Sequence, residues 1–488
     1  MGLVRSVAKN TLAMGSVQLA SQISTFILSI FLQYHLGNAY GVYSYAFSLA
    51  SLVFILADFG LGFQMVVDVS PNHKISSQYL TNTLFLRALL GGASMIITLV
   101  IVIISALPQD VSLAIMIIAL STAFNWISLT FTSMMTAFER MHYVLYTNLV
   151  ERVFTVSVAI ALLTLGFGLE AIVLVVLTGS MLNVVLSWLT TSKYITKPAR
   201  RPDLAQSKHQ IRTGVPYALT GVLTTSLYSL NAVLVWNVIM WTGQGSYMAA
   251  HATALYNLSF NLVVALIAVP TILITALLPV ISRMYKTSTE MTKLTQQKVM
   301  KYMFSLGLPM SIGGIILADG IIQFFYAPEF WESARVFQYL VPVIAISYFG
   351  TGIGSVLASA KLIRLNTMAS GVGATVNLVL CLVLIPFLGA IGAALAFTIS
   401  FLALTITGLH FLTKNVFKVD LLDILIKPSV AGLGMGLVLV VLPGLFPGLG
   451  FIPWIIVGVV VYFALMLAVG ALNKEDKEIL VKILKKEA

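Results

Sequence analysis

The chain has 488 residues, of which 59% are hydrophobic and only 9% are charged. A soluble domain carries about 25% charged residues, so this composition excludes an ordinary soluble protein. The formal net charge of +11 would suit nucleic acid, but the basic residues lie in short segments between apolar blocks, where they set membrane orientation. The sequence therefore predicts a membrane protein that binds no nucleic acid.

The apolar blocks predict helices rather than barrel strands. Crossing about 30 Å of hydrocarbon takes roughly 20 apolar residues, and only helices or closed barrels satisfy their own backbone there. Blocks such as Ile96–Leu107 and Val430–Leu442 lack the strict alternation of a barrel strand. We expect about fourteen spans, at 11–33, 42–69, 79–107, 111–136, 143–165, 171–191, 213–241, 250–281, 302–318, 336–360, 366–386, 391–412, 428–446 and 452–472.

The basic residues between these spans predict the orientation. Of the 28 lysines and arginines, 25 fall in segments on one side, Arg335 falls on the other, and Arg87 and Arg152 lie inside spans. Cytoplasmic loops carry the excess of positive charge, so both termini are expected on the cytoplasmic side. The membrane itself is expected to be the cell membrane, either a bacterial inner membrane or a plasma membrane. The longest basic loops are expected at 192–212 and 282–301, and 475–486 is predicted to be an amphipathic surface helix.

An internal repeat divides the chain. The segment 139–190 aligns with 361–412 without a gap. Six spans per copy enter from the same side, as in transporters built from parallel repeats. We expect an all-α fold of two pseudo-symmetric six-helix lobes, 1–191 and 213–412. A basic linker, 192–212, joins the lobes, and two extra helices and a cytoplasmic tail occupy 413–488.

Charged residues inside spans are costly and mark functional candidates. The first lobe holds four: Asp58, Arg87, Glu151 and Arg152. One hypothesis is that the two arginines line a cavity and bind a phosphate, because a guanidinium donates two parallel hydrogen bonds. Asp58 or Glu151 would then orient them or bind a coupling proton or Na⁺. The alternative is structural: Asp58 and Arg87 form a buried ion pair, while Arg152 extends to the headgroups.

The spans of the second lobe offer neutral polar groups instead. Asn231, Asn237 and Asn261 are the candidates for substrate contacts there. No metal site is expected, because Cys381 is the single cysteine and the six histidines show no ligand spacing. The outer segment Asp319–Arg335 is aromatic and is predicted to be a helix lying in the interface.

The stretch Val7–Leu61 carries a family resemblance. It has Lys-Asn before the first span, Leu36-Gly37 followed by Tyr40-Gly41-x-Tyr43, and Asp58-Phe59-Gly60-Leu61. These motifs, with Ile385–Ala394 (IPFLGAIGAA) and Tyr326–Phe330, resemble polysaccharide exporters of the multidrug/oligosaccharidyl-lipid/polysaccharide superfamily. The resemblance implies two lobes that open alternately to each side, and a polyprenyl-(pyro)phosphate-linked glycan as cargo.

The leading expectation is therefore a flippase for a lipid-linked oligosaccharide in polysaccharide biosynthesis, and not an enzyme. An ion-coupled drug or metabolite exporter of the same superfamily stays open. A membrane-embedded glycan polymerase or glycosyltransferase is the third hypothesis, although the longest outer segment spans only about 17 residues. No cofactor is expected apart from a coupling Na⁺ or H⁺. A cavity within one chain needs no partner, so a monomer among membrane lipids is expected.

Overall fold

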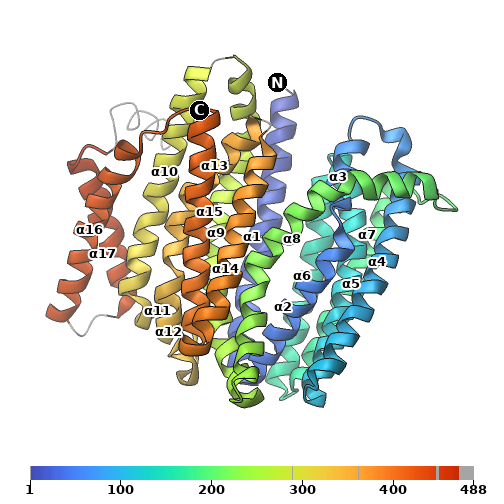
Figure 1. The fold of residues 1–488 in the computed structure, drawn as a ribbon, viewed down its shortest axis with the longest axis horizontal. Coiled ribbons are helices and arrows are strands. Elements are labelled where there is room, and N and C mark those ends of the chain that lie inside the picture. Colours follow the sequence, from blue (N-terminus) through green and yellow to red (C-terminus); the bar gives the residue numbers. More distant parts are fainter. Residues whose placement is uncertain (1, 288, 361, 447–449, 472–488) are drawn as a thin grey trace. The chain divides into compact units, whose positions relative to one another are not determined.

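The computed structural model describes residues 2–287, 289–360, 362–446 and 450–471 (Figure 1). Every regular element among these residues is helical. The first half contains α1 (Gly2–Leu36), α2 (Ala39–Asp58), α3 (Leu61–Val69), η1 (His73–Ile75), α4 (Ser76–Ser105), α5 (Gln109–Ala137), α6 (Met141–Thr164), α7 (Leu169–Tyr194) and α8 (Leu204–Trp241). The second contains α9 (Gly245–Thr287), α10 (Thr289–Ile316), α11 (Ala318–Phe325), η2 (Pro328–Phe330), α12 (Ser333–Leu340), α13 (Pro342–Ser359), α14 (Ile363–Leu388), α15 (Ala390–Asn415), α16 (Leu421–Leu445) and α17 (Phe451–Ala468).

The predicted number of spans is confirmed. Fourteen segments of the described chain are long and apolar enough to cross a bilayer, which makes this an all-α, multi-pass membrane protein. The loop expected at 282–301 is not found, because the described residues of this range are helical and belong to α9 and α10. The part of a helix that extends beyond the membrane has polar residues, so hydropathy does not distinguish it from a loop. The expected surface helix at 475–486 lies outside the described residues.

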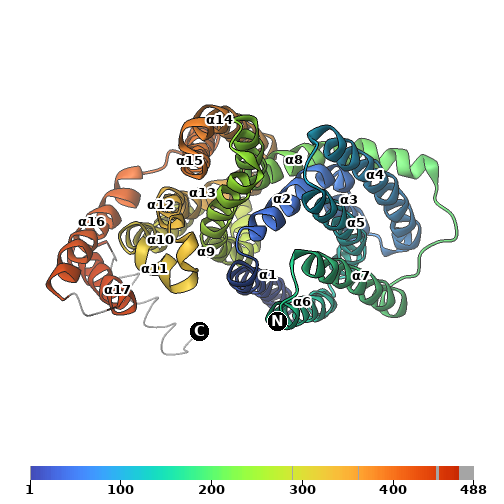
Figure 2. The same cartoon turned by 90° about the horizontal axis from the view of Figure 1, so that it is seen from below.

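One compact unit comprises Met1–Ala276 with Ser370–Ser400. Within it, α1, α6, α7, α5 and α2 follow one another around a ring, each in contact with the next (Figure 2). α4 packs outside α5, and α8 packs along α2. The polar candidates predicted from the sequence all belong to this unit, so their mutual geometry is defined.

The other compact unit comprises Leu277–Ala369 with Phe401–Ala488. Its described part is built on α10, which packs against α13 and α16, while α16 pairs with α17. Asp423 at the start of α16 joins two lysines: its carboxylate lies 3.1 Å from the buried Lys301 and 3.4 Å from Lys427. The pair with Lys301 fixes one end of α16 against α10, whereas Lys427 and Asp423 are paired within α16 itself.

The helix boundaries follow the predicted repeat. α6 begins at Met141 and α14 at Ile363, which are equivalent positions when 139–190 is aligned with 361–412. α7 begins at Leu169, and α15 begins at Ala390, directly beside the equivalent position. The two compact units cut the chain elsewhere than at the expected lobes 1–191 and 213–412, so the division into lobes stays a prediction.

Candidate functional site

Arg87 of α4 is enclosed by three helices. Its guanidinium lies 2.6 Å from Asp58 Oδ1 at the end of α2. It also donates to the Trp126 carbonyl (2.8 Å) and Thr130 Oγ1 (2.9 Å) of α5. The Arg87 side chain has no exposed surface, whereas Asp58 is 22% exposed. In this conformation Arg87 therefore joins α2, α4 and α5 and does not face open space.

The second span is broken immediately after Asp58. Phe59 and Gly60 have φ values of 44° and 71°, which end α2 and start α3. A left-handed conformation is unfavourable for a bulky residue such as Phe59. α8 packs closely against this break, because a Cβ on Gly214 would lie 2.7 Å from the Phe59 carbonyl oxygen. The span expected at 42–69 therefore consists of two helices, α2 and α3, and the helix is interrupted between them at Phe59 and Gly60.

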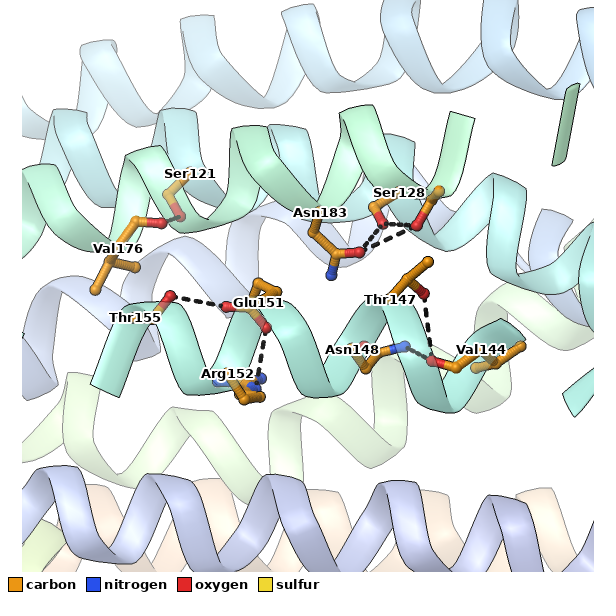
Figure 3. A network of polar contacts seen from close by, with 11 residues as sticks. Ser121, Ser128, Val144, Thr147, Asn148, Glu151, Arg152, Thr155, Val176 and Asn183 are labelled. Atoms are coloured by element: carbon orange, nitrogen blue, oxygen red, sulfur yellow. Dashed lines mark hydrogen bonds and ion pairs between the residues drawn. The ribbon is translucent and has the colours of Figure 1, made fainter. Parts of the chain in front are cut away.

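Glu151 and Arg152 lie on α6 within the ring (Figure 3). Glu151 is 7% exposed, and its Oε1 accepts a hydrogen bond from Thr155 at 3.2 Å. Its other oxygen lies 3.4 Å from Arg152 Nε. Although adjacent residues leave a helix about 100° apart, the two side chains bend toward each other and pair.

The two members of this pair have different surroundings. Glu151 is turned toward α7, where a Cβ on Gly179 would lie 3.6 Å from its carboxylate. Arg152 is 39% exposed and borders a narrow groove between α1 and α6, which is too tight in this conformation to admit a water-sized molecule. The other residues lining the groove are Val17, Ala20, Ser21, Leu145, Asn148 and Leu149. Arg152 is therefore accessible where Arg87 is not.

Neutral polar groups from α5 and α7 line the ring near Glu151. Asn183 Oδ1 accepts hydrogen bonds from Ser128 (2.9 Å) and Ser187 (3.1 Å). Figure 3 shows the amide nitrogen of Asn183 on the side facing α6. Sequence reasoning missed these residues, although the four-residue spacing of Asn183 and Ser187 places them on one helix face. These neutral side chains and Glu151 are buried polar groups on neighbouring helices of the ring.

The three predicted asparagines have separate roles in this structure. Asn231 is fully buried, donates to the Ala393 carbonyl at 3.1 Å and accepts from Asn377 at 2.5 Å. It therefore holds α8, α14 and α15 together. Asn237 and Asn261 instead reach α2, where they donate to the hydroxyl groups of Tyr45 (3.4 Å) and Tyr40 (3.0 Å).

These two contacts belong to a larger packed interface between the start of α2, the end of α8 and the start of α9. This interface is here called the seal. His251 Nδ1 lies 2.9 Å from Asn38 Oδ1, and Tyr45 stacks on Trp236 with ring centroids 4.5 Å apart. The backbones approach so closely that a Cβ on Gly41 would overlap the Ala250 carbonyl oxygen. The sequence signalled this seal only through its cluster of tyrosines at 40, 43 and 45.

The chain is similar to proteins of known family and fold. The family model described as polysaccharide biosynthesis protein matches residues 7–285, more than half of the chain. No curated protein sequence matches the chain. The fold is similar to the lipid II flippase MurJ in an inward closed conformation, at 13% identity and a TM-score of 0.73, covering 94% of this chain and 98% of MurJ.

Two other solved structures share the fold. An inward-facing multidrug resistance MATE family transporter of the MOP superfamily is 15% identical with a TM-score of 0.62, covering 84% of this chain and 98% of that one. A MOP superfamily transporter from Pyrococcus furiosus Vc1 is 12% identical with a TM-score of 0.53, covering 85% of this chain and 97% of that one. The chain therefore belongs to the polysaccharide biosynthesis protein family and has the fold of the multidrug/oligosaccharidyl-lipid/polysaccharide superfamily.

Proposed function

We propose that this protein is a flippase that moves a polyprenyl-(pyro)phosphate-linked oligosaccharide from the cytoplasmic to the outer leaflet. Membership of a polysaccharide biosynthesis family supports a glycan cargo. The likeness to a lipid II flippase supports a lipid-linked one. The observation that carries the proposal is the ion pair between Glu151 and Arg152. Glu151 is buried, whereas Arg152 is partly exposed beside the groove between α1 and α6. We further propose that both termini lie in the cytoplasm and that one chain is the transporting unit.

Arg152 is proposed to bind the phosphate of the cargo. Its guanidinium is accessible, and its pairing with Glu151 holds it beside the groove. A phosphate oxygen is a better partner for a guanidinium than a carboxylate held only at 3.4 Å. Cargo binding would therefore release Glu151 from Arg152. Asn237 and Asn261 are proposed to meet the cargo once the seal with α2 opens.

Glu151 is proposed to be the coupling group. A buried carboxylate that loses its arginine must find another positive charge or take up a proton, because an unpaired buried charge is costly. The neutral polar interior around Asn183 suits either H⁺ or Na⁺. Asp58 is proposed to act only through Arg87, because its Oδ1 is already held at 2.6 Å.

The test uses liposomes that contain the purified chain and a fluorescent polyprenyl-pyrophosphate oligosaccharide. A membrane-impermeant reductant added outside bleaches the probe that has reached the outer leaflet. We expect bleaching beyond the initial half for the native chain. Arg152→Gln should slow it about tenfold or more, since a hydrogen bond to a charged group contributes roughly 1.5–3 kcal/mol. Glu151→Gln should make the rate insensitive to proton and Na⁺ gradients.

Arg140→Gln is the matched control. Arg140 is an exposed arginine that directly precedes α6, so its removal changes the net charge equally without touching the groove. Its flipping rate should equal that of the native chain. If the native chain moves no probe under either gradient, the flippase proposal is wrong. If Arg152→Gln flips at the native rate, the assigned phosphate contact is wrong.

An ion-coupled drug exporter is the second candidate. The likeness to multidrug MATE transporters favours it. The enclosure of Arg87 favours it too, because Arg152 is then the one predicted arginine of the two that an anionic cargo could reach. Gradient-driven efflux of a cationic dye from the same liposomes, with no movement of the glycan probe, would establish this alternative. Catalysis by a membrane-embedded polymerase has no comparable support.

A further inference from the structure

The connection between α7 and α8 is an ordered segment tied to the start of α4. Four side chains of α4 bind backbone groups of this segment. Ser77 donates to the Lys197 carbonyl (2.8 Å), Thr81 to Ala199 (3.2 Å), Gln78 to Arg201 (3.0 Å), and Asn82 accepts from the Asp203 amide (2.8 Å). While the backbone of the segment is bound to α4, its basic side chains are exposed.

The first turns of α8 continue this surface. Asp203 caps the helix by accepting from the amides of Ala205 (2.9 Å) and Gln206 (3.2 Å). Figure 1 shows these turns running across the ends of neighbouring helices of the same unit, not along them. Ser207 and Gln210 are buried, whereas Lys208, Ile211 and Arg212 are exposed. One face thus packs on the protein and the opposite face is cationic and apolar.

The charge of this surface is strongly one-sided. Residues 193–215, here called the cationic strap, contain six exposed cations: Lys193, Lys197, Arg200, Arg201, Lys208 and Arg212. Asp203 is the single acidic residue of the strap, and its carboxylate is occupied by the helix cap. None of the six cations is used by the proposed transport site.

Aromatic and apolar side chains place the strap at the level of lipid headgroups. Trp188 and Tyr194 at the end of the α7 span are 47% and 52% exposed, and such rings gather at the membrane–water boundary. Lys193 Nζ lies 5.1 Å from the centroid of the Tyr194 ring. On α8, Leu204 is 68% exposed and Val215 is 50% exposed. Exposed cations directly beside exposed apolar groups match a phospholipid, which offers phosphate and acyl chain together.

We infer that the cationic strap is a binding surface for anionic phospholipid headgroups of the adjoining leaflet. Lysine and arginine side chains would bind headgroup phosphates, and Leu204, Ile211 and Val215 would contact the acyl-chain boundary. An acidic soluble protein would meet the charges but leave these apolar groups exposed. The inference rests on membrane insertion alone, so it holds whether or not the chain moves a lipid-linked glycan.

The test measures phosphatidylglycerol binding to the purified full chain in neutral detergent, by native mass spectrometry at increasing lipid. The strap variant is Lys197→Gln/Arg200→Gln/Arg201→Gln. Each basic residue near an anionic surface strengthens binding roughly fivefold, so three removals should weaken it about a hundredfold. Binding by the native chain should fall when NaCl is raised, and phosphatidylcholine binding should not change with the variant.

The matched control removes three exposed cations from the other compact unit, as Arg364→Gln/Lys414→Gln/Lys418→Gln. It should bind phosphatidylglycerol like the native chain. Arg200→Lys/Arg201→Lys keeps the strap charge and should also bind normally, which separates lost charge from a disturbed fold. Equal weakening in both triple variants would reduce the effect to net charge and overturn the inference. Unchanged binding in the strap variant would overturn it as well.

Discussion

Linking positions 38 and 251 with a short, reducible crosslinker is expected to stop transport completely. Asn38 and His251 meet at 2.9 Å in the seal between the starts of α2 and α9. In the proposed cycle this seal must open to release cargo to the outer side. With cysteine at both positions, a bis-methanethiosulfonate reagent would hold it closed. Probe bleaching in liposomes should fall to the protein-free level and recover after dithiothreitol.

The chain offers a matched control for this experiment. His73 and Phe138 stack with ring centroids 4.1 Å apart at one end of α4 and α5. Both lie in the unit that holds the ring, away from the seal, so crosslinked cysteines there should leave transport unchanged. The native Cys381 is buried and does not compete for the reagent. Full transport by a completely crosslinked 38/251 pair would show that the seal does not open during the cycle.

Replacing Arg87 with methionine is expected to destabilise the protein strongly. Arg87 has no exposed surface and makes three polar contacts, one of them the ion pair with Asp58. Removing one partner of a buried ion pair costs about 3–5 kcal/mol, because the other charge stays without a counter-charge. Thermal unfolding in detergent should therefore occur at a markedly lower temperature than in the native chain.

Two further variants distinguish an ion pair from simple loss of packing. Asp58→Asn/Arg87→Met removes both charges and should recover part of the lost stability. Arg140→Gln removes an exposed arginine that directly precedes α6 and should change the free energy of unfolding by no more than about 0.5 kcal/mol. If Arg87→Met unfolds at the native temperature, the enclosed ion pair does not hold α2, α4 and α5 together.

The two arginines show how far the sequence defined the site. Both are found from one criterion, a charge within an apolar span. Their separation into an enclosed residue, Arg87, and an accessible one, Arg152, depends on neighbouring helices. In a membrane protein lipid and protein interior are both apolar, so hydrophobic periodicity does not report which helix face is buried. The contacts of Tyr40 and Tyr45 with distant helices are hidden for the same reason.

The sequence by itself determined the membrane class, the number of spans and the charged candidates. Hydrocarbon thickness fixes the length of each apolar block, and a charge in such a block stands out. Only the tertiary structure decided the break at Phe59–Gly60, the helical course of the described residues within 282–301, the seal at α2 and the seating of the cationic strap. Each of these rests on contacts between residues far apart in the chain, or on helix that continues into water, where hydropathy carries no signal.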